Sequence, residues 1–425
     1  MSDKKLNCNF CGKSRDQVEK LIAGPNVYIC NECITISYEI LDDEQFDAKL
    51  AEYSDIPTPR EIHDYLNIYI TGQEEAKEIL STSAYNHYKR INHKSNNDVV
   101  VEKSNVLMVG PTGTGKTLFA KTLARKLGVP FAIADATTLT EAGYVGDDVE
   151  SVLERLLVVA DYDIEKAQRG IIYIDEIDKK TRKSESSTTT RDVSGEGVQQ
   201  ALLRLVEGTV TKVKLGMASK KFSEDTAEFD TSNVLFIVGG AFVGIEEFIT
   251  KRIKNKTGVG FTGNVVSKEE SNTILKSLQP DDVVKYGLIP ELVGRLPIIT
   301  TLDNLSEEQL VEIMQNIKNS IVDQVKELML YNEIELEFSI DYFKDVASRA
   351  SKTGMGARAV KSIVENSLFY LMYNAPELQE DNVVKVIFDK YPSRIEKPMA
   401  MYADGTSKYL KDYRFFRNNM LDIAK

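Results

Sequence analysis

The stretch Gly110-Pro111-Thr112-Gly113-Thr114-Gly115-Lys116-Thr117 decides the fold of this chain. It follows the apolar run 106–109 and precedes a helical pattern through Phe119, Leu123 and Leu127. The spacing is that of a Walker A loop, in which glycines let backbone N–H groups turn inward on a phosphate. The start of the helix adds a favourable dipole for the same anion. The stretch therefore predicts a strand, a phosphate-binding loop and a helix, and with them a nucleotide site.

Two side chains of this loop have specific expected roles. Lys116 is expected to reach the outer phosphates, and the hydroxyl of Thr117 is expected to bind Mg²⁺. A glycine-rich turn alone is usually only a tight turn, so the prediction depends on the full pattern in its strand-to-helix context. The residues assigned to nucleotide binding are Gly110, Pro111, Thr112, Gly113, Thr114, Gly115, Lys116, Thr117 and Leu118.

An acidic pair follows another apolar strand. Residues 171–174 are Ile-Ile-Tyr-Ile, and Asp175 and Glu176 come directly after them. Such a pair is more often only a solvated strand end, but together with the upstream loop it forms a Walker B motif. In that motif Asp175 holds the Mg²⁺ shell and Glu176 polarises the attacking water. Asp175, Glu176 and Lys116 are therefore candidate catalytic residues, and Thr117 and Asp175 are candidate Mg²⁺ ligands.

All four cysteines lie near the beginning of the chain. They form Cys8-x-x-Cys11 and Cys30-x-x-Cys33, separated by residues 12–29. Two such pairs can place four thiolates on one Zn²⁺ in a closed, tetrahedral structural site. The alternatives are two disulfides, or reduced thiols without a metal. With few apolar residues nearby, the module is expected to depend on zinc for folding.

Length and composition limit the possible classes of protein. A chain of 425 residues is expected to form two or three domains. Its 42% hydrophobic and 28% charged residues are typical of soluble globular proteins. No apolar run suits a membrane span or a secretory signal, so we expect a cytoplasmic protein. The net charge of −12 argues against a nucleic-acid partner and favours polypeptides or small molecules.

The order of apolar segments predicts the organisation of the chain. Alternating strands and helices over about 200 residues predict a doubly wound α/β domain. One expected helix of this domain begins at Asp147. The later sequence predicts helices at 307–330, 341–350 and 357–373 and strands near 334–336 and 383–388, which suggests a smaller α+β domain. The expected parts are a zinc module (1–45), a flexible linker (46–60), a large ATPase domain (61–305), a small domain (306–402) and a tail of unknown role (403–425).

Several connecting stretches accompany these motifs. They lie at residues 8–13, 21–25, 85–90, 174–179, 191–200 and 294–297. With them, residues 8–402 resemble the ClpX family of AAA+ protein unfoldases. The resemblance implies an ATPase that forms a homo-hexameric ring around a pore. The sequence shows no nucleophile–base constellation for peptide cleavage, so we expect no peptidase activity of its own. It also implies ATP, Mg²⁺ and Zn²⁺ as cofactors, a ClpP-type peptidase as partner, and adaptors or substrates at the zinc module.

The same resemblance assigns roles to two arginines. Arg295 corresponds to the arginine finger that reaches the γ-phosphate of a neighbouring subunit, and Arg358 corresponds to the sensor-2 arginine. Such cations stabilise charge that grows in the transition state. For either arginine taken alone, a surface or helix-cap position is the alternative interpretation.

Two further segments resemble functional loops of the family. Tyr144 and Val145, between glycines, correspond to the pore loop that grips substrate by apolar contact. Val259, Gly260 and Phe261 correspond to the loop that docks into the peptidase, and an exposed phenylalanine suits an anchor residue. A turn residue at Tyr144 and a core position for Phe261 are the alternatives.

The chain departs from the family at two places. Around residues 219–221 the sequence is Ser-Lys-Lys, where the family usually has an Arg-Lys-His cluster at the pore entrance. Many AAA+ proteins carry a polar sensor-1 side chain at the end of a strand, where this chain has Gly239-Gly240-Ala241. No sensor-1 residue is therefore assigned.

The leading hypothesis is an ATP-driven unfoldase that feeds a separate peptidase. One alternative is a stand-alone chaperone or remodelling factor, for which an anchor at Phe261 would have no use. A second alternative is a nucleic-acid motor with a zinc finger, which the acidic composition and Tyr144 disfavour.

Overall fold

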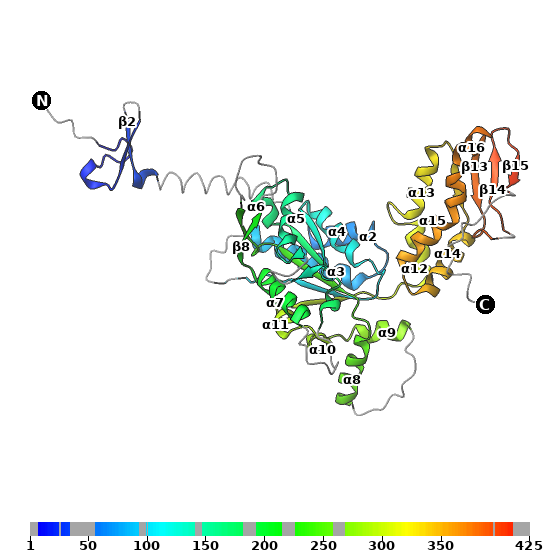
Figure 1. Ribbon diagram of the computed structural model, residues 1–425, viewed down its shortest axis with the longest axis horizontal. Helices are drawn as coiled ribbons and strands as arrows, with labels where there is room; N and C mark the ends of the chain where they lie inside the picture. The colour runs from blue at the N-terminus through cyan, green and yellow to red at the C-terminus, as the bar shows by residue number, and fades with distance from the viewer. Residues whose placement is uncertain are drawn as a thin grey trace. The chain divides into compact units, whose positions relative to one another are not determined.

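The computed structural model describes residues 7–24, 27–34, 56–92, 99, 101–140, 147–181, 193–214, 226–257, 268–393 and 396–410 (Figure 1). The chain divides into two compact units, residues 1–56 with 88–97, and residues 57–87 with 98–425. The predicted pore loop at Tyr144 and Val145, the predicted docking segment at 259–261 and residues 219–221 lie outside the described residues. Among the described helices, none combines the length and hydrophobicity that a membrane span requires.

The first unit contains a small hairpin with the cysteines around it. The strands β1 (Leu21–Gly24) and β2 (Val27–Cys30) pair antiparallel, and the short 3₁₀ helix η1 (Arg15–Gln17) precedes them. The register pairs Leu21 with Cys30, so that the second cysteine pair begins where the hairpin ends.

The main sheet of the second unit has five parallel strands in the order β11-β3-β10-β7-β4. Their bounds are β3 (Val106–Val109), β4 (Phe131–Asp135), β7 (Ile171–Asp175), β10 (Leu235–Gly240) and β11 (Ile298–Thr301). Every residue of β3 and β10 is buried. Strands covered on both faces need continuous apolar runs, and these runs are what the sequence shows. The expected α/β fold with a parallel sheet is confirmed.

Helices surround this sheet (Figure 1). Helix α4 packs on β7 and β10, and α5 packs on β4. The helices and 3₁₀ helices are α2 (Pro59–Asn67), α3 (Glu74–Asn92), α4 (Lys116–Leu127), α5 (Ser151–Val159), α6 (Ile164–Gln168), η2 (Ile177–Lys180), α7 (Val193–Glu207), α8 (Ile245–Thr257), α9 (Lys268–Leu275), α10 (Pro280–Tyr286) and α11 (Pro290–Gly294). Two minor sheets join β5 (Leu139–Thr140) to β6 (Asp147–Asp148) and β8 (Val210–Lys214) to β9 (Thr226–Asp230).

One expected helix start is wrong. The helix predicted from Asp147 begins instead at Ser151, because Asp147 and Asp148 pair as strand β6 with Leu139 and Thr140. The apolar residues that form the expected face of this helix are nevertheless buried in the core, namely Val149, Val152, Leu153, Leu156, Leu157 and Ala160. Side-chain periodicity identified the buried face but not the residue at which the helix begins.

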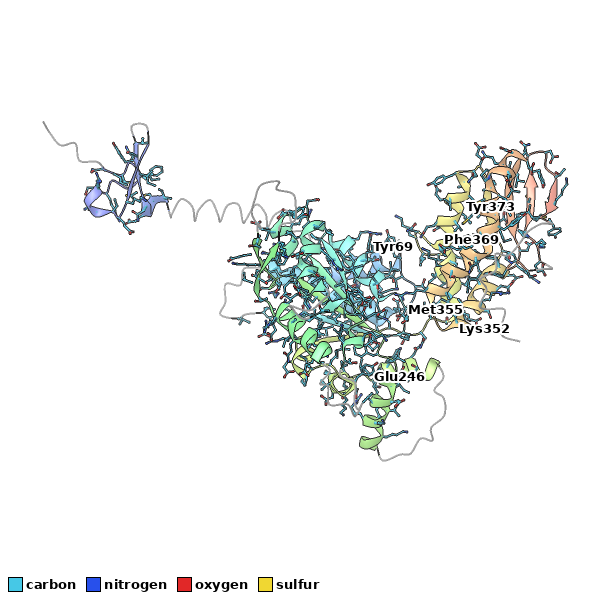
Figure 2. The ribbon with its side chains drawn as sticks, in the orientation of Figure 1. Tyr69, Glu246, Lys352, Met355, Phe369 and Tyr373 are labelled. Atoms are coloured by element: carbon cyan, nitrogen blue, oxygen red, sulfur yellow. The ribbon has the colours of Figure 1, made fainter. Side chains whose placement is uncertain are left out.

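The C-terminal part of the second unit forms its own hydrophobic cluster, separate from that of the main sheet. Its helices are α12 (Glu307–Gln315), α13 (Ile321–Leu330), α14 (Ile340–Thr353), α15 (Ala357–Tyr373) and α16 (Ala375–Glu380). Its sheet has the order β12-β13-β14-β15, with β12 (Glu335–Phe338), β13 (Val383–Phe388), β14 (Met399–Tyr402) and β15 (Ser407–Tyr409). Phe369 and Tyr373 are exposed on α15, one turn apart (Figure 2).

The single helix predicted over 307–330 is wrong, because α12 and α13 are separate. Asn319 has a φ of 61°, which ends any continuing helix. The Ser320 side chain accepts from the backbone N–H of Asp323, and the carboxylate of Asp323 accepts from the N–H of Ser320. This capping box starts a new helix at Ile321.

Hydrogen bonds to the segment between α2 and α3 hold the chain where the main sheet part passes into the C-terminal part. The amide of Gln73 donates to the carbonyl of Asp303 and accepts from its N–H, each at 2.8 Å. The N–H of Lys318 also donates to the carbonyl of Ile68 at 2.9 Å. These contacts are made with backbone groups, so they define the junction independently of the side chain at 303.

Asn105 is the buried polar residue that precedes β3. Its amide group donates to the carbonyls of Val206 (3.2 Å) and Arg295 (3.1 Å), and its oxygen accepts from the N–H of Phe236 (3.2 Å). Asn105→Ala should therefore leave buried backbone groups unpaired and lower the free energy of unfolding by about 2–3 kcal/mol. The measurement is denaturant unfolding. Asn366→Ala, at a half-buried site on α15, is the control and should change stability by less than about 0.5 kcal/mol.

Candidate functional site

The loop between β3 and α4 has the backbone geometry that its glycines predict. Gly113 and Gly115 have φ values of 82° and 98°, in the region that favours glycine. Gly115 is the N-terminal cap of α4, which begins at Lys116. A Cβ at Gly110 would lie 2.7 Å from the carbonyl oxygen of Leu302. The loop therefore requires glycine at positions 113 and 115 because of their backbone conformation, and at position 110 because a side chain would have no space.

Lys116 is folded against its own loop. Its Nζ donates to the carbonyls of Gly110 (2.6 Å) and Pro111 (3.0 Å), and the residue is only 8% exposed. Burial lowers the pKa of Lys116, and the negative charge of Asp175 opposes that shift. A bound polyphosphate would stabilise the ammonium further, because it adds negative charge beside a buried cation.

Thr117 and Asp175 lie in contact, although they belong to different motifs. The Thr117 hydroxyl donates to Oδ2 of Asp175 at 3.0 Å. The N–H of Glu176 donates to Oδ1 of Asp175 at 2.9 Å. This arrangement follows from the parallel sheet, in which β10 pairs with β3 on one side and β7 on the other. The strands thus end at one edge and bring the loop and the acidic pair together.

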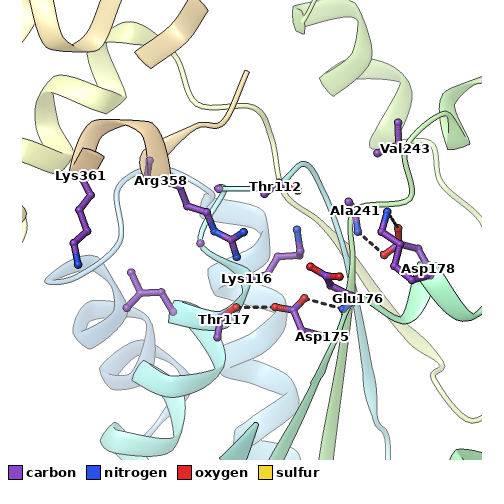
Figure 3. A pocket seen from close by; sticks show the side chains of 15 residues that line it. Thr112, Lys116, Thr117, Asp175, Glu176, Asp178, Ala241, Val243, Arg358 and Lys361 are labelled. Carbon is purple, nitrogen blue, oxygen red and sulfur yellow. Dashed lines mark hydrogen bonds and ion pairs between the residues drawn. The ribbon is translucent and has the colours of Figure 1, made fainter. Parts of the chain in front are cut away.

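Glu176 has a left-handed backbone conformation, with φ 58° and ψ 33°. Such a conformation is uncommon for a residue that is not glycine, and it is found frequently at functional sites. It turns the chain sharply at the end of β7. Figure 3 shows the side chains of Lys116, Glu176 and Arg358 around the same space.

Arg358 reaches the site because α15 begins against the phosphate loop. The N–H of Ala357 donates to the carbonyl of Gly113 at 3.1 Å. A Cβ at Gly113 would lie 2.1 Å from the carbonyl oxygen of Met355, and one at Gly356 would lie 2.8 Å from that of Gly113. Two glycines from distant parts of the chain thus allow close backbone contact, which the sequence motif did not show.

These residues surround a cavity of about 390 Å³. It is lined by Thr112, Gly113, Gly115, Lys116, Thr117, Leu118, Asp175, Glu176, Asp178, Lys179, Ala241, Val243, Ala357, Arg358 and Lys361. Of the residues assigned to nucleotide binding, Gly110, Pro111 and Thr114 do not line the cavity. Thr114 instead donates to the carbonyl of Pro111 at 2.9 Å and shapes the loop.

Asp178 also lines the site, although no sequence motif identifies it. Its buried carboxylate accepts from the N–H of Ala241 at 3.0 Å and lies 3.4 Å from the ammonium of Lys179. It therefore connects the turn after β7 to the turn after β10. Its position three residues after Asp175, past the carboxyl end of the strand, is the sequence signal that could have identified it.

Arg295 does not line the cavity. Its Nε donates to Glu207 at 2.9 Å, and its side chain is 50% exposed. Within the described residues this carboxylate is the single ion-pair partner of Arg295. Asn105 holds the backbone of Arg295, while Glu207 ends helix α7. The guanidinium is therefore held at the surface by Glu207.

The four cysteines are close together in the first unit. Their sulfur atoms all lie within 4.8 Å of one another, with Cys8 and Cys33 at 3.9 Å and Cys11 and Cys30 at 3.6 Å. Zn–S bonds of about 2.3 Å in a tetrahedron place the sulfurs about 3.8 Å apart, whereas a disulfide requires about 2.05 Å. The cysteines are free thiols, so the geometry fits zinc and excludes the two-disulfide alternative.

The surroundings of Cys8 favour the thiolate that zinc requires. Burial opposes ionisation of Cys8, but hydrogen bonds from the backbone of Cys11, Cys30 and Phe10 outweigh it and lower the pKa of Cys8 to about 6. Burial and hydrogen bonding within the cluster raise the pKa of Cys33 to about 12. Four thiolates therefore need the charge of a cation to exist together.

Removal of zinc should unfold the four-cysteine module and expose its thiols. A chelator should make all four cysteines reactive to a thiol reagent, because no disulfide protects them, and addition of zinc should reverse the change. Lower pH should also release zinc, since protons compete for the thiolates. Thiol titration and protease resistance are the measurements. Thiols that react fully before chelation would contradict the zinc site.

Three family models match the chain. The ClpX C4-type zinc finger matches residues 6–43, the AAA domain of the Cdc48 subfamily matches residues 101–299, and the C-terminal, D2-small domain of ClpB protein matches residues 305–385. The zinc finger covers the four-cysteine cluster, and the AAA domain covers the nucleotide loop and the acidic pair. These three matches, in this order along the chain, are consistent with a ClpX-like AAA+ protein.

Proposed function

We propose that this chain hydrolyses ATP to unfold proteins and passes them to a ClpP-type peptidase. The observation that carries the ATPase part is the convergence of Lys116, Asp175, Glu176 and Arg358 on one cavity. The ClpX-type zinc finger supports the unfoldase part, since the resemblance that includes it implies that activity.

The site suits a nucleotide with Mg²⁺. The Thr117 hydroxyl and the Asp175 carboxylate, 3.0 Å apart, are hard oxygen donors of the kind that Mg²⁺ prefers. Bound there, Mg²⁺ would neutralise phosphate charge. The loop glycines keep side chains away from the backbone N–H groups, and the N-terminus of α4 favours an anion.

The proposed roles follow from where the side chains lie. Lys116 would exchange its two loop carbonyls for phosphate oxygens. Glu176 would accept a proton from the attacking water. Arg358, which enters the cavity from α15, would stabilise the charge that develops on the phosphates.

The position of Arg295 suits a side chain that acts in the nucleotide site of a neighbouring subunit. It lies outside the cavity of its own subunit, and its half-exposed guanidinium is anchored at one side by Glu207. In a ring, the same side chain would complete the site of the adjacent copy. An isolated subunit would then hydrolyse ATP weakly. The proposed assembly is a homo-hexamer.

Glu176→Gln should retain ATP binding and lose turnover by about a hundredfold or more, because the amide cannot accept the proton of water. Binding of a fluorescent ATP analogue and release of phosphate are measured in parallel. Glu377→Gln, an exposed substitution of the same kind on α16, is the control and should change neither quantity. Rapid hydrolysis by Glu176→Gln would remove the role proposed for this carboxylate.

The coupling to a peptidase is proposed for the segment containing Phe261. The experiment mixes the purified chain with a ClpP-type peptidase, ATP and a stable tagged protein, and it measures both unfolding and degradation. We expect both activities. A chain that unfolds the substrate without degradation would instead be a stand-alone remodelling factor.

Phe261→Ala should unfold the tagged protein at the parent rate and lose most of its degradation. The reason is that an apolar anchor contributes to docking but not to ATP hydrolysis. Thr262→Ala, the next residue in the same segment, is the matched control and should degrade normally. Unchanged degradation by Phe261→Ala would place the docking surface elsewhere.

A further inference from the structure

Tyr173 is a fully buried tyrosine whose hydroxyl ends at the acidic pair. It is 0% exposed, and its hydroxyl donates to Oδ1 of Asp175 at 3.1 Å. Both residues belong to β7, where a period of two places them on the same face. Tyr173 does not line the cavity. Any effect it has on a bound nucleotide must therefore pass through the residues that its hydroxyl contacts, chiefly Asp175.

The neighbouring strand leaves space for this hydroxyl. Ile237 of β10 is the register partner of Tyr173, so Gly239 lies two residues further along the same face. A Cβ at Gly239 would lie 2.2 Å from the Tyr173 oxygen and 2.8 Å from the ring carbon that bears it. Gly239 has no positive φ, so the requirement for glycine here is one of space.

The next residue, Gly240, also leaves space for groups from other segments. A Cβ at Gly240 would lie 2.5 Å from the ring of Phe242 and 2.8 Å from Oδ1 of Asp178. The pair Gly239-Gly240, which supplies no polar side chain of its own, thus leaves space for two polar groups from other segments. One is the Tyr173 hydroxyl and the other is the Asp178 carboxylate.

We propose that Tyr173 is a positioning residue that orients the Asp175 carboxylate for Mg²⁺, and that Gly239 is required to admit its hydroxyl. The inference rests on the proposed Mg·ATP site. Oδ1 of Asp175 accepts from the Tyr173 hydroxyl and from the N–H of Glu176, while Oδ2 accepts from Thr117. The two donors to Oδ1 hold the carboxylate so that Oδ2 faces the Thr117 hydroxyl, which would bind the same Mg²⁺ ion.

The Tyr173 hydroxyl is the donor in its bond to Asp175, because the carboxylate can only accept. A phenylalanine would fit the same space without supplying that donor.

The test separates metal-dependent binding from the rest of nucleotide binding. A fluorescent, non-hydrolysable ATP analogue is titrated into the full chain, once with Mg²⁺ and once with EDTA. The ratio of the two affinities is the gain from Mg²⁺. Tyr173→Phe should lower this ratio about tenfold, as expected for loss of one hydrogen bond to a charged group, while the affinity in EDTA stays unchanged. Gly239→Ala should act in the same direction, because it displaces the hydroxyl.

Tyr342→Phe is the matched control. Tyr342 is equally buried, and its hydroxyl bonds to Ser367 at 2.6 Å in the C-terminal part. This variant also loses a buried hydroxyl, but its ratio of affinities with Mg²⁺ and with EDTA should equal that of the parent protein. Thermal melting of both variants shows whether stability changes equally.

Two results would overturn the inference. One is a parent-like ratio in Tyr173→Phe. The other is an equal loss of affinity with and without Mg²⁺, which would indicate a general packing role. A parent protein whose affinity is the same in Mg²⁺ and in EDTA would instead refute the proposed Mg·ATP site, so the two failures are distinguishable.

Discussion

The parallel pairing of β10 with β3 and β7 is the constraint on which the rest of the site depends. It aligns the carboxyl ends of the strands, so the loop after β3 and the acidic pair after β7 meet at one edge. For this reason the Thr117 hydroxyl lies 3.0 Å from Oδ2 of Asp175, although the two residues are 58 positions apart in the sequence. A shift of one residue in the pairing register of β7 would direct the side chains of Tyr173 and Asp175 to the opposite face of the sheet.

Close backbone contacts complete this arrangement. Gly113 and Gly356 let the phosphate loop approach the start of α15, and the resulting hydrogen bond from Ala357 to Gly113 brings Arg358 to the cavity. The C-terminal part therefore contributes to the site through the backbone as well as through a side chain. A movement of α15 relative to the loop would change both contacts together.

Much of the site could be predicted because its chemistry is local in sequence. The glycine spacing specifies a loop around an anion, and the two cysteine pairs specify a zinc site that the sulfur positions fit. The roles proposed for Arg295 and Arg358 came from a resemblance and remain proposals, although Arg358 lines the cavity. The helix predicted over 307–330 failed because a capping box at Ser320 overrides the apolar pattern.

The sequence by itself determined the parallel α/β class, the nucleotide loop and the zinc module, since apolar runs and motif spacing specify them within short segments. Only the tertiary structure decided which group occupies the space beside Gly239 and which carboxylate holds Arg295. Those answers, Tyr173 and Glu207, come from separate strands and helices. The physical reason is that such contacts depend on strand register and packing, which no local pattern specifies.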